Sequence, residues 1–288
     1  MRTETFQTPG PVQLDVRLGA GEVSLEATHT EETTVILEPL RDNDASVEAV
    51  QTARVELREG GARPELVVDV RGRSRSLFRG AEVLVRVTCP LESAAEVRTG
   101  SADVEGRGLF GSVDVETGSG DVQFGEVSGN GKINAASGDI EVGLIGGEGH
   151  VNTASGDVQI RMIGGDGRVN TASGDVLIRT AGGSLQVNSA SGDVLVKEAL
   201  GSVSVNTASG DQAIGNVLHH RVDLKSASGD IRVGIKQGSA LHVDARSRSG
   251  EVRSELEVSD VPPAGDAPLV ELRANTMSGD ITVTRATG

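Results

Sequence analysis

The chain has 288 residues, a formal net charge of −15 and 36% hydrophobic residues, but it contains no Trp, no Tyr and only four Phe. This charge disfavours binding to nucleic acid or to an anionic membrane surface. The single cysteine, Cys89, excludes an internal disulfide. No apolar stretch has the length of a signal peptide or a membrane span, so we expect a cytoplasmic protein without membrane insertion.

Residues 1–92 show strand patterns without a fixed period. VQLDVRLGAGEVSLEA, near the start, resembles an imperfect repeat unit with Glu22 near the acid position, and TTVILEP, ARVELRE, ELVVDVRG and AEVLVRVTCP are typical of further strands. DNDASVEAVQTA predicts a short helix with Asp44 or Ser46 as its N-cap. We predict that residues 1–92 form a β-rich cap, or a lateral extension, that covers the first unit of the region that follows.

An arginine-rich segment, RGRSRSLFRG, lies between two of these strands in an otherwise acidic chain. The simpler interpretation is a solvated hairpin loop. The alternative is a docking loop for an acidic partner or a phosphate group, since guanidinium groups bind both. The residues of this possible docking loop are Arg71, Arg73, Arg75, Leu77, Phe78 and Arg79.

From residue 93 onward a triplet of Ser-Gly-Asp type recurs ten times. The interval is 18 residues through Asp211 and then 19, 21 and 29, so the last interval holds an insertion near 259–268. Val or Ile stands one and three residues after most of the acids and glycine marks the corners, a strand-and-turn pattern. The sequence predicts an all-β fold for 93–288: a single-stranded parallel β-helix, or β-solenoid, of about ten 18-residue coils, right-handed and stacked about 4.8 Å apart.

The acids of the triplets form one column of the expected stack. Turn chemistry is the favoured interpretation, with glycine supplying a left-handed residue and Ser and Asp capping backbone N–H groups of the corner. Calcium binding is the alternative, but GGDGRVNTA has Val169 where the calcium-binding repeat needs aspartate. The predicted turn ladder comprises Asp103, Asp121, Asp139, Asp157, Asp175, Asp193, Asp211, Asp230 and Asp280.

A second polar column consists of asparagines beside an inward-facing Val. Stacked amides hydrogen-bond to one another along parallel strands, so we expect a structural ladder here. Its predicted members are Asn134, Asn152, Asn170, Asn188, Asn206 and Asn275.

No arrangement of residues predicts catalysis or a cofactor. The five histidines do not align within the repeat, which argues against a metal site. The abundant serines have no predicted base partner. We therefore expect no enzyme activity, no metal and no cofactor.

The recurring NTASGDV and SGDI motifs resemble a bacterial family of β-strand-repeat proteins known as putative adhesins, a domain of unknown function, here of actinobacterial type. The resemblance is strong over residues 95–288, and the N-terminal strands and the CPLESAAEVRTGSADV segment are also similar to that family. It implies a single-stranded β-helix and no known catalytic residues.

These observations favour a non-enzymatic structural or protein-interaction scaffold with an unidentified protein partner. A surface adhesin exported by another route is the first alternative, and a filament former similar to bactofilins is the second. The strand pattern SGDITVTRATG runs almost to residue 288, so we expect an uncovered last coil there. The expected state is a monomer or a weak end-to-end homodimer through Ile281–Gly288.

Overall fold

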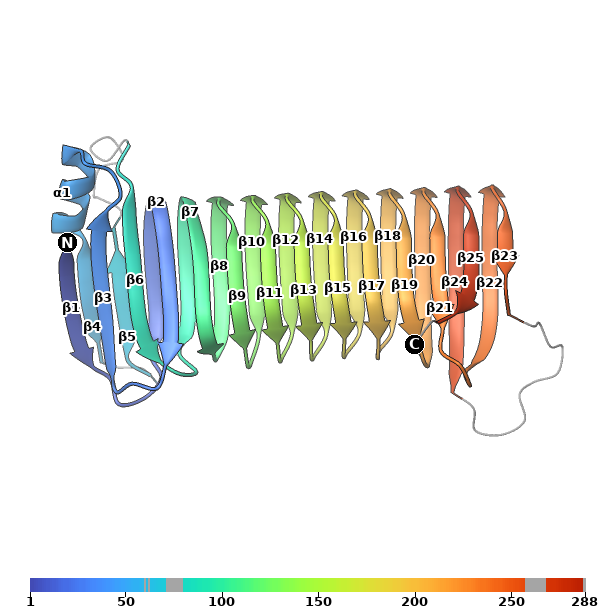
Figure 1. Cartoon of the computed structure of the whole chain (residues 1–288), viewed down its shortest axis with the longest axis horizontal. Coiled ribbons are helices and arrows are strands. Elements are labelled where there is room, and N and C mark those ends of the chain that lie inside the picture. Colours follow the sequence, from blue (N-terminus) through green and yellow to red (C-terminus); the bar gives the residue numbers. More distant parts are fainter. Residues whose placement is uncertain (60, 62, 71–79, 257–267, 287–288) are drawn as a thin grey trace. The chain divides into compact units, whose positions relative to one another are not determined.

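A computed structural model describes residues 1–59, 61, 63–70, 80–256 and 268–286 (Figure 1). The chain forms two compact units, Met1–Gly147 and Glu148–Gly288. Almost every described element is a strand, and strands 18 residues apart pair in parallel, so the predicted β-solenoid is confirmed. Residues 71–79 of the predicted loop at 71–80 and most of the predicted insertion near 259–268 lie outside the described residues.

The first unit begins with a cap of mixed strands and one helix. Strand β1 pairs antiparallel with β3, β3 with β6, and β4 with β5, while β2 pairs in parallel with both β5 and β6. The elements are β1 (Arg2–Gln7), β2 (Gln13–Thr28), β3 (Glu32–Pro39), α1 (Asp44–Thr52), β4 (Arg54–Arg58), β5 (Glu65–Asp69) and β6 (Val83–Pro90).

Helix α1 lies where the sequence predicts it, but the predicted cap is wrong. The N-cap is Asn43, whose side-chain oxygen accepts a hydrogen bond of 2.8 Å from the backbone N–H of Ser46. Asn43 has the extended backbone that an N-cap requires, whereas Asp44 already belongs to the first turn. Asn side chains cap as well as Asp or Ser, so Asn43 could have been considered beside the two predicted residues.

Strand β2 is itself a coil. It pairs in parallel with β7 (Ala94–Phe110), Gln13 opposite Ala94 and Glu22 opposite Asp103. Leu14 and Val16 of β2 are fully buried because alternate side chains point into the core. Coil stacking therefore includes residues within the range predicted as a cap, and Glu22 occupies the acid position as expected.

The rest of the first unit repeats the same coil, with two strands in each. Strand β8 pairs in parallel with β7 and β10, and β9 pairs with β7 and β11. The strands are β8 (Ser112–Ser119), β9 (Val122–Val127), β10 (Gly131–Ser137) and β11 (Ile140–Ile145).

The second unit continues the pattern with a register of 18 residues. Val151, Val169, Val187 and Val205 lie opposite one another in successive coils and are at most 1% exposed. Its first eight strands are β12 (Gly149–Ser155), β13 (Val158–Ile163), β14 (Gly167–Ser173), β15 (Val176–Ala181), β16 (Leu185–Ser191), β17 (Val194–Ala199), β18 (Val203–Ser209) and β19 (Gln212–Val217).

The last three coils do not stack in chain order. Strands β24 and β25 lie between β20–β21 and β22–β23, as Figure 1 shows. The expectation that the coil ending at Ile281–Gly288 is uncovered is therefore wrong: β25 has β21 on one side and β23 on the other. These strands are β20 (His220–Ser228), β21 (Ile231–Ile235), β22 (Ala240–Ser249), β23 (Val252–Ser254), β24 (Leu269–Ser278) and β25 (Ile281–Arg285).

This order determines which coil is buried. Val270, Leu272 and Ala274 of β24 are fully buried between two neighbouring coils, whereas Val243 and Val252 of the outer coil are 41% and 49% exposed. The exposure of the outer coil follows from its place at the end of the described stack. The Asp230–Glu251 interval is three residues longer than 18, which adds about 10 Å of reach, more than the one extra coil height of about 4.8 Å.

Candidate interaction faces

Within each unit, hydrogen bonds of the acid column join successive coils. The carboxylate of Asp157 accepts a hydrogen bond of 2.8 Å from the backbone N–H of Asp175, and Asp175 accepts one of the same length from Asp193. The column passes from Asp230 to Asp280 and ends at Glu251. Each acid caps the N–H of the neighbouring coil, not of its own turn. The other acceptors are Asp103, Asp121, Asp193 and Asp211, while Asp139 donates to Asp121.

The corner also contains a buried hydroxyl. Thr153 donates a hydrogen bond of 2.9 Å to the carbonyl of Ser155, and Thr171 does the same to Ser173. Both threonines are 6% exposed. The Ser/Thr column four residues before the acid was visible in the sequence, and in the structure its hydroxyl finds a hydrogen-bond acceptor within the corner.

The asparagine column forms a hydrogen-bonded ladder over four coils. Asn170 donates to Asn152 at 2.8 Å, Asn188 to Asn170 at 2.8 Å, and Asn206 to Asn188 at 3.1 Å. Asn134 belongs to the first unit and lies opposite Glu116.

Asn275 does not join this ladder, contrary to prediction. It lies between Lys225 and Arg246, and Lys225 separates it from Asn206. The column that contains it therefore changes from amides to cations beyond Asn206, which lies opposite Lys225.

The outer face of β13, β15 and β17 carries a row of cations. Arg161, Arg179 and Lys197 occupy equivalent positions in three successive coils, and all three are exposed. Like charges at the coil spacing of about 4.8 Å repel by about 0.9 kcal/mol in water. Leu177 and Leu195 stand two residues before two of these cations, so they share their outward face. We call these five residues the basic row.

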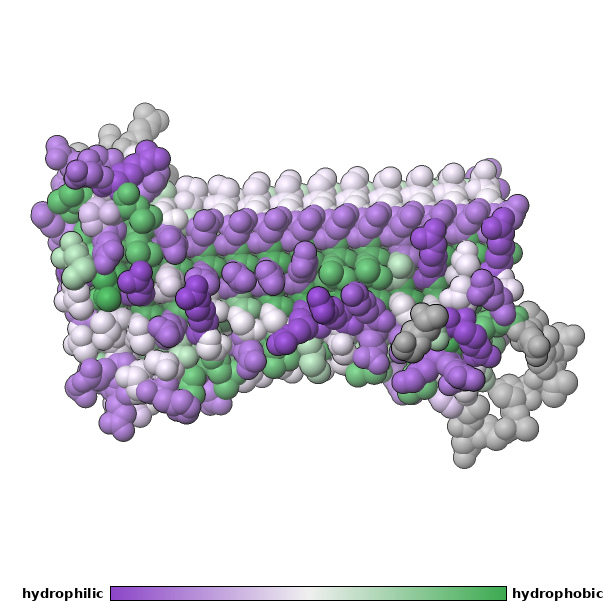
Figure 2. All heavy atoms as spheres, viewed as in Figure 1, coloured by the Kyte–Doolittle hydropathy of each residue, from purple (hydrophilic) through white to green (hydrophobic). Residues whose placement is uncertain are grey.

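On the other sheet face of the second unit, residues of β12, β14, β16, β18 and β20 line a shallow groove of about 510 Å³. Its lining includes His150, Arg168 and Gln186 in successive coils and ends at the ion pair of Arg221 with Asp223, 2.6 Å apart. Figure 2 shows, for one face, that hydrophilic and hydrophobic surface alternates in such rows. The groove holds both signs of charge and favours no single class of ligand.

Titratable groups show no catalytic arrangement within the described residues. No group of three or more His, Cys, Asp or Glu side chains there is placed to hold a metal ion. Cys89 is fully buried, and burial raises the pKa of its thiol to about 11, so it is unreactive at neutral pH. No helix of the described chain is long and apolar enough to cross a membrane.

Comparison with protein families gives two overlapping matches, at residues 11–165 and 148–284, to the Toastrack DUF4097 model. The chain belongs to the Toastrack DUF4097 family. The match begins well before residue 95, in agreement with the coil formed by β2.

Several solved structures are similar to this chain over nearly its whole length, but their sequence identity to it is low. A putative adhesin from Parabacteroides distasonis is 12% identical with a TM-score of 0.48, over 98% of this chain and 96% of that chain. A putative lipid binding protein from the same species has 12% identity, the same coverage and a TM-score of 0.41. A putative adhesin from Bacteroides fragilis has 12% identity, the same coverage and a TM-score of 0.35. No curated protein matches. Likenesses this distant transfer no function.

The basic row of this Toastrack chain was not found from the sequence. Its signal was present: the position four residues after the acid is Arg, Arg and Lys in three successive repeats. The predicted columns were the repeated acids and amides instead. The arginine-rich segment predicted as a possible docking loop lies outside the described residues; its members are Arg71, Arg73, Arg75, Leu77, Phe78 and Arg79.

Proposed function

We propose that this Toastrack chain is a non-enzymatic, cytoplasmic scaffold that binds an acidic segment of a partner protein along the basic row. The observation that carries the proposal is the stacking of three cations in a chain of net charge −15. A column of like charges is unfavourable in the free protein and becomes favourable when an anionic partner covers it.

The neighbouring surface supports a peptide or protein partner. Leu195 is 37% exposed and Met162 is 38% exposed on the same strands. Apolar side chains beside cations suit a partner segment that alternates acidic and apolar residues. The cations of the basic row lie on the paired strands β13, β15 and β17. Their spacing is therefore fixed before a partner binds, and binding does not require a loop to become ordered.

The test compares two charge reversals that change the net charge equally. In the first variant Arg179→Glu and Lys197→Glu remove the basic row. In the control Arg107→Glu and Lys132→Glu alter cations that lie on other strands, each in an ion pair with an acid. Anisotropy of a labelled Glu-Leu repeat peptide should show binding to the wild type and the control, weakened by salt, and not to the first variant.

Pull-down of native partners with the same three proteins, followed by mass spectrometry, should give the same pattern. Equal capture by all three would overturn the proposed site. Recovery of the native protein from the outer cell surface would overturn the cytoplasmic scaffold in favour of an adhesin.

A further inference from the structure

The outer edge of the second unit is an unpaired strand. Strand β22 pairs in parallel with β24, and no other described strand lies beside it. The N–H of Ala240 points to the carbonyl of Pro268 on the β24 side. Because backbone groups alternate along a strand, those of Leu241, Val243, Ala245 and Ser247 point away from β24. They form a template for a further strand.

The end of the core at this edge also remains open. Val243 lies opposite Leu272, which is fully buried, yet Val243 itself is 41% exposed. Val252 is 49% exposed although its partner, Ile281, is fully buried. Both valines point into the core from a coil that nothing in the described chain covers. A second layer of strands would remove this apolar surface from water.

The outward charges of the last coils alternate toward the edge. Asp223 lies opposite Arg273, and Arg273 lies opposite Asp244. The next place in this column is vacant. Arg246, two residues along, lies opposite the neutral Asn275, and its own next place is also vacant. A strand added beside β22 would therefore be favoured by a cation opposite Asp244 and by an anion opposite Arg246.

A second copy of the same strand supplies both. If two β22 strands run antiparallel about a twofold axis at Ala245, Asp244 of each copy faces Arg246 of the other. This register is the one in which both Asp244 residues face an Arg246, since a shift of the axis by one residue to Asp244 or to Arg246 places like charges opposite each other. A twofold contact also closes, so it yields a dimer and not a filament.

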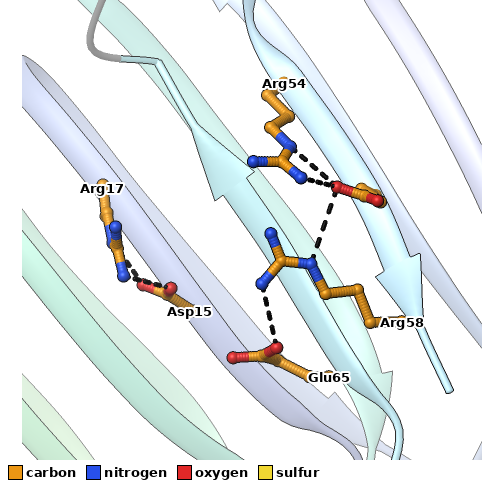
Figure 3. A network of polar contacts seen from close by, with 6 residues as sticks. Asp15, Arg17, Arg54, Arg58 and Glu65 are labelled. Carbon is orange, nitrogen blue, oxygen red and sulfur yellow. Dashed lines mark hydrogen bonds and ion pairs between the residues drawn. The ribbon is translucent and has the colours of Figure 1, made fainter. Parts of the chain in front are cut away.

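The chain already contains such a pairing. In the antiparallel pair of β4 and β5, Arg58 lies opposite Glu65 at 3.2 Å and also contacts Glu56, two residues back on its own strand, at 3.6 Å (Figure 3). Arg246 makes the equivalent contact with Asp244 of its own strand, 3.0 Å between Nε and Oδ1. Only the carboxylate from across the strand pair is missing.

We infer that β22 is a self-association edge, at which two copies of the chain join antiparallel through their outermost coils. The inference goes beyond the scaffold function and does not depend on it. It places the contact at Asp244–Arg246 instead of at the C-terminal coil, whose strand β25 lies between β21 and β23.

The test exchanges charges between two variants of the full chain. In a dimer of the Asp244→Arg variant, the new cation at position 244 lies opposite Arg246 of the other copy. In a dimer of the Arg246→Asp variant, the new anion at position 246 lies opposite Asp244 of the other copy. Because each dimer places like charges opposite each other, its dissociation constant should be at least about tenfold higher than that of the wild type. Mixed in equal amounts, they regain two opposite-charge pairs and should form a heterodimer. Analytical ultracentrifugation measures the dissociation, and mass spectrometry under native conditions identifies the heterodimer.

The control pair is Asp223→Arg and Arg221→Asp, which alter an ion pair of the same kind on β20, a covered coil. These variants should associate like the wild type, and circular dichroism should show all of them folded. A wild type that stays monomeric up to near-millimolar concentration overturns the inference. So does a dimer that the β22 variants leave intact, or a mixture that forms no heterodimer.

Discussion

Replacing Gly174 by Ala tests whether close stacking of the coils, and not backbone angle alone, requires glycine at the corner. Gly174 has a φ of 116°, and a Cβ there would lie 2.2 Å from the carbonyl oxygen of Gly156 in the preceding coil. Positive φ costs an L-residue about 1–2 kcal/mol, and forcing two packed backbones apart adds about 1–3 kcal/mol. We expect the free energy of unfolding to fall by about 2–5 kcal/mol.

Gly238→Ala is the matched control. Gly238 also has a positive φ, 91°, but a Cβ there has no atom within 4 Å. Its loss should therefore be limited to the backbone cost of about 1–2 kcal/mol. Urea unfolding followed by far-UV circular dichroism suits a protein without Trp or Tyr. Equal losses in the two variants would refute the argument from coil spacing.

Further predictions concern the coil register, the acid column and Cys89. Deleting Val158–Asp175 removes one complete coil in register, so the product should keep its β-type circular dichroism, whereas deletion of half that range should unfold it; similar behaviour of both would contradict the register. Asp193→Ala removes the acceptor of the Asp211 N–H and should lower the free energy of unfolding by about 0.5–1.5 kcal/mol. Millimolar calcium should leave the melting temperature of the wild type within about 2 °C of its value in chelator, and a larger shift would indicate a metal site. The Cys89 thiol should resist thiol reagents in the native state at about pH 8. Its raised pKa should contribute stability that is complete below 9.0 and lost as pH rises toward about 11, with a decline that is smaller in Cys89→Ala; fast native labelling would show that the thiol is accessible.

The coil could be predicted because each repeat must offer the next the same contacts. Val169 and Asn170 recur at 18 residues because one points into the core and the other forms a hydrogen bond along the stack. The order of the last coils could not be predicted, since interval length alone does not say whether a coil takes the next place or the one beyond it. Asn275 is outside the amide ladder for a separate reason, because Lys225 stands at the equivalent position of the coil next to Asn206.

The basic row was overlooked for a different reason. Arg161, Arg179 and Lys197 obey the same period as the structural columns, and periodicity by itself does not separate residues that hold coils together from residues that the coils display. The structure separates them: the carboxylate of Asp175 bonds to the next coil, while the side chains of the basic row face outward.

The enclosed position of β24 and β25 has a consequence for biosynthesis. A solenoid whose coils stack in chain order can fold while it leaves the ribosome, one coil after another. Here residues 240–254 emerge first but belong one place farther out than residues 269–285. Until the later segment is made, β20 and β21 have an empty neighbouring place, and the earlier segment can occupy it out of register. Folding of this end must therefore wait for the later segment or reverse a first pairing, and we expect it to be the slowest step in maturation of the chain.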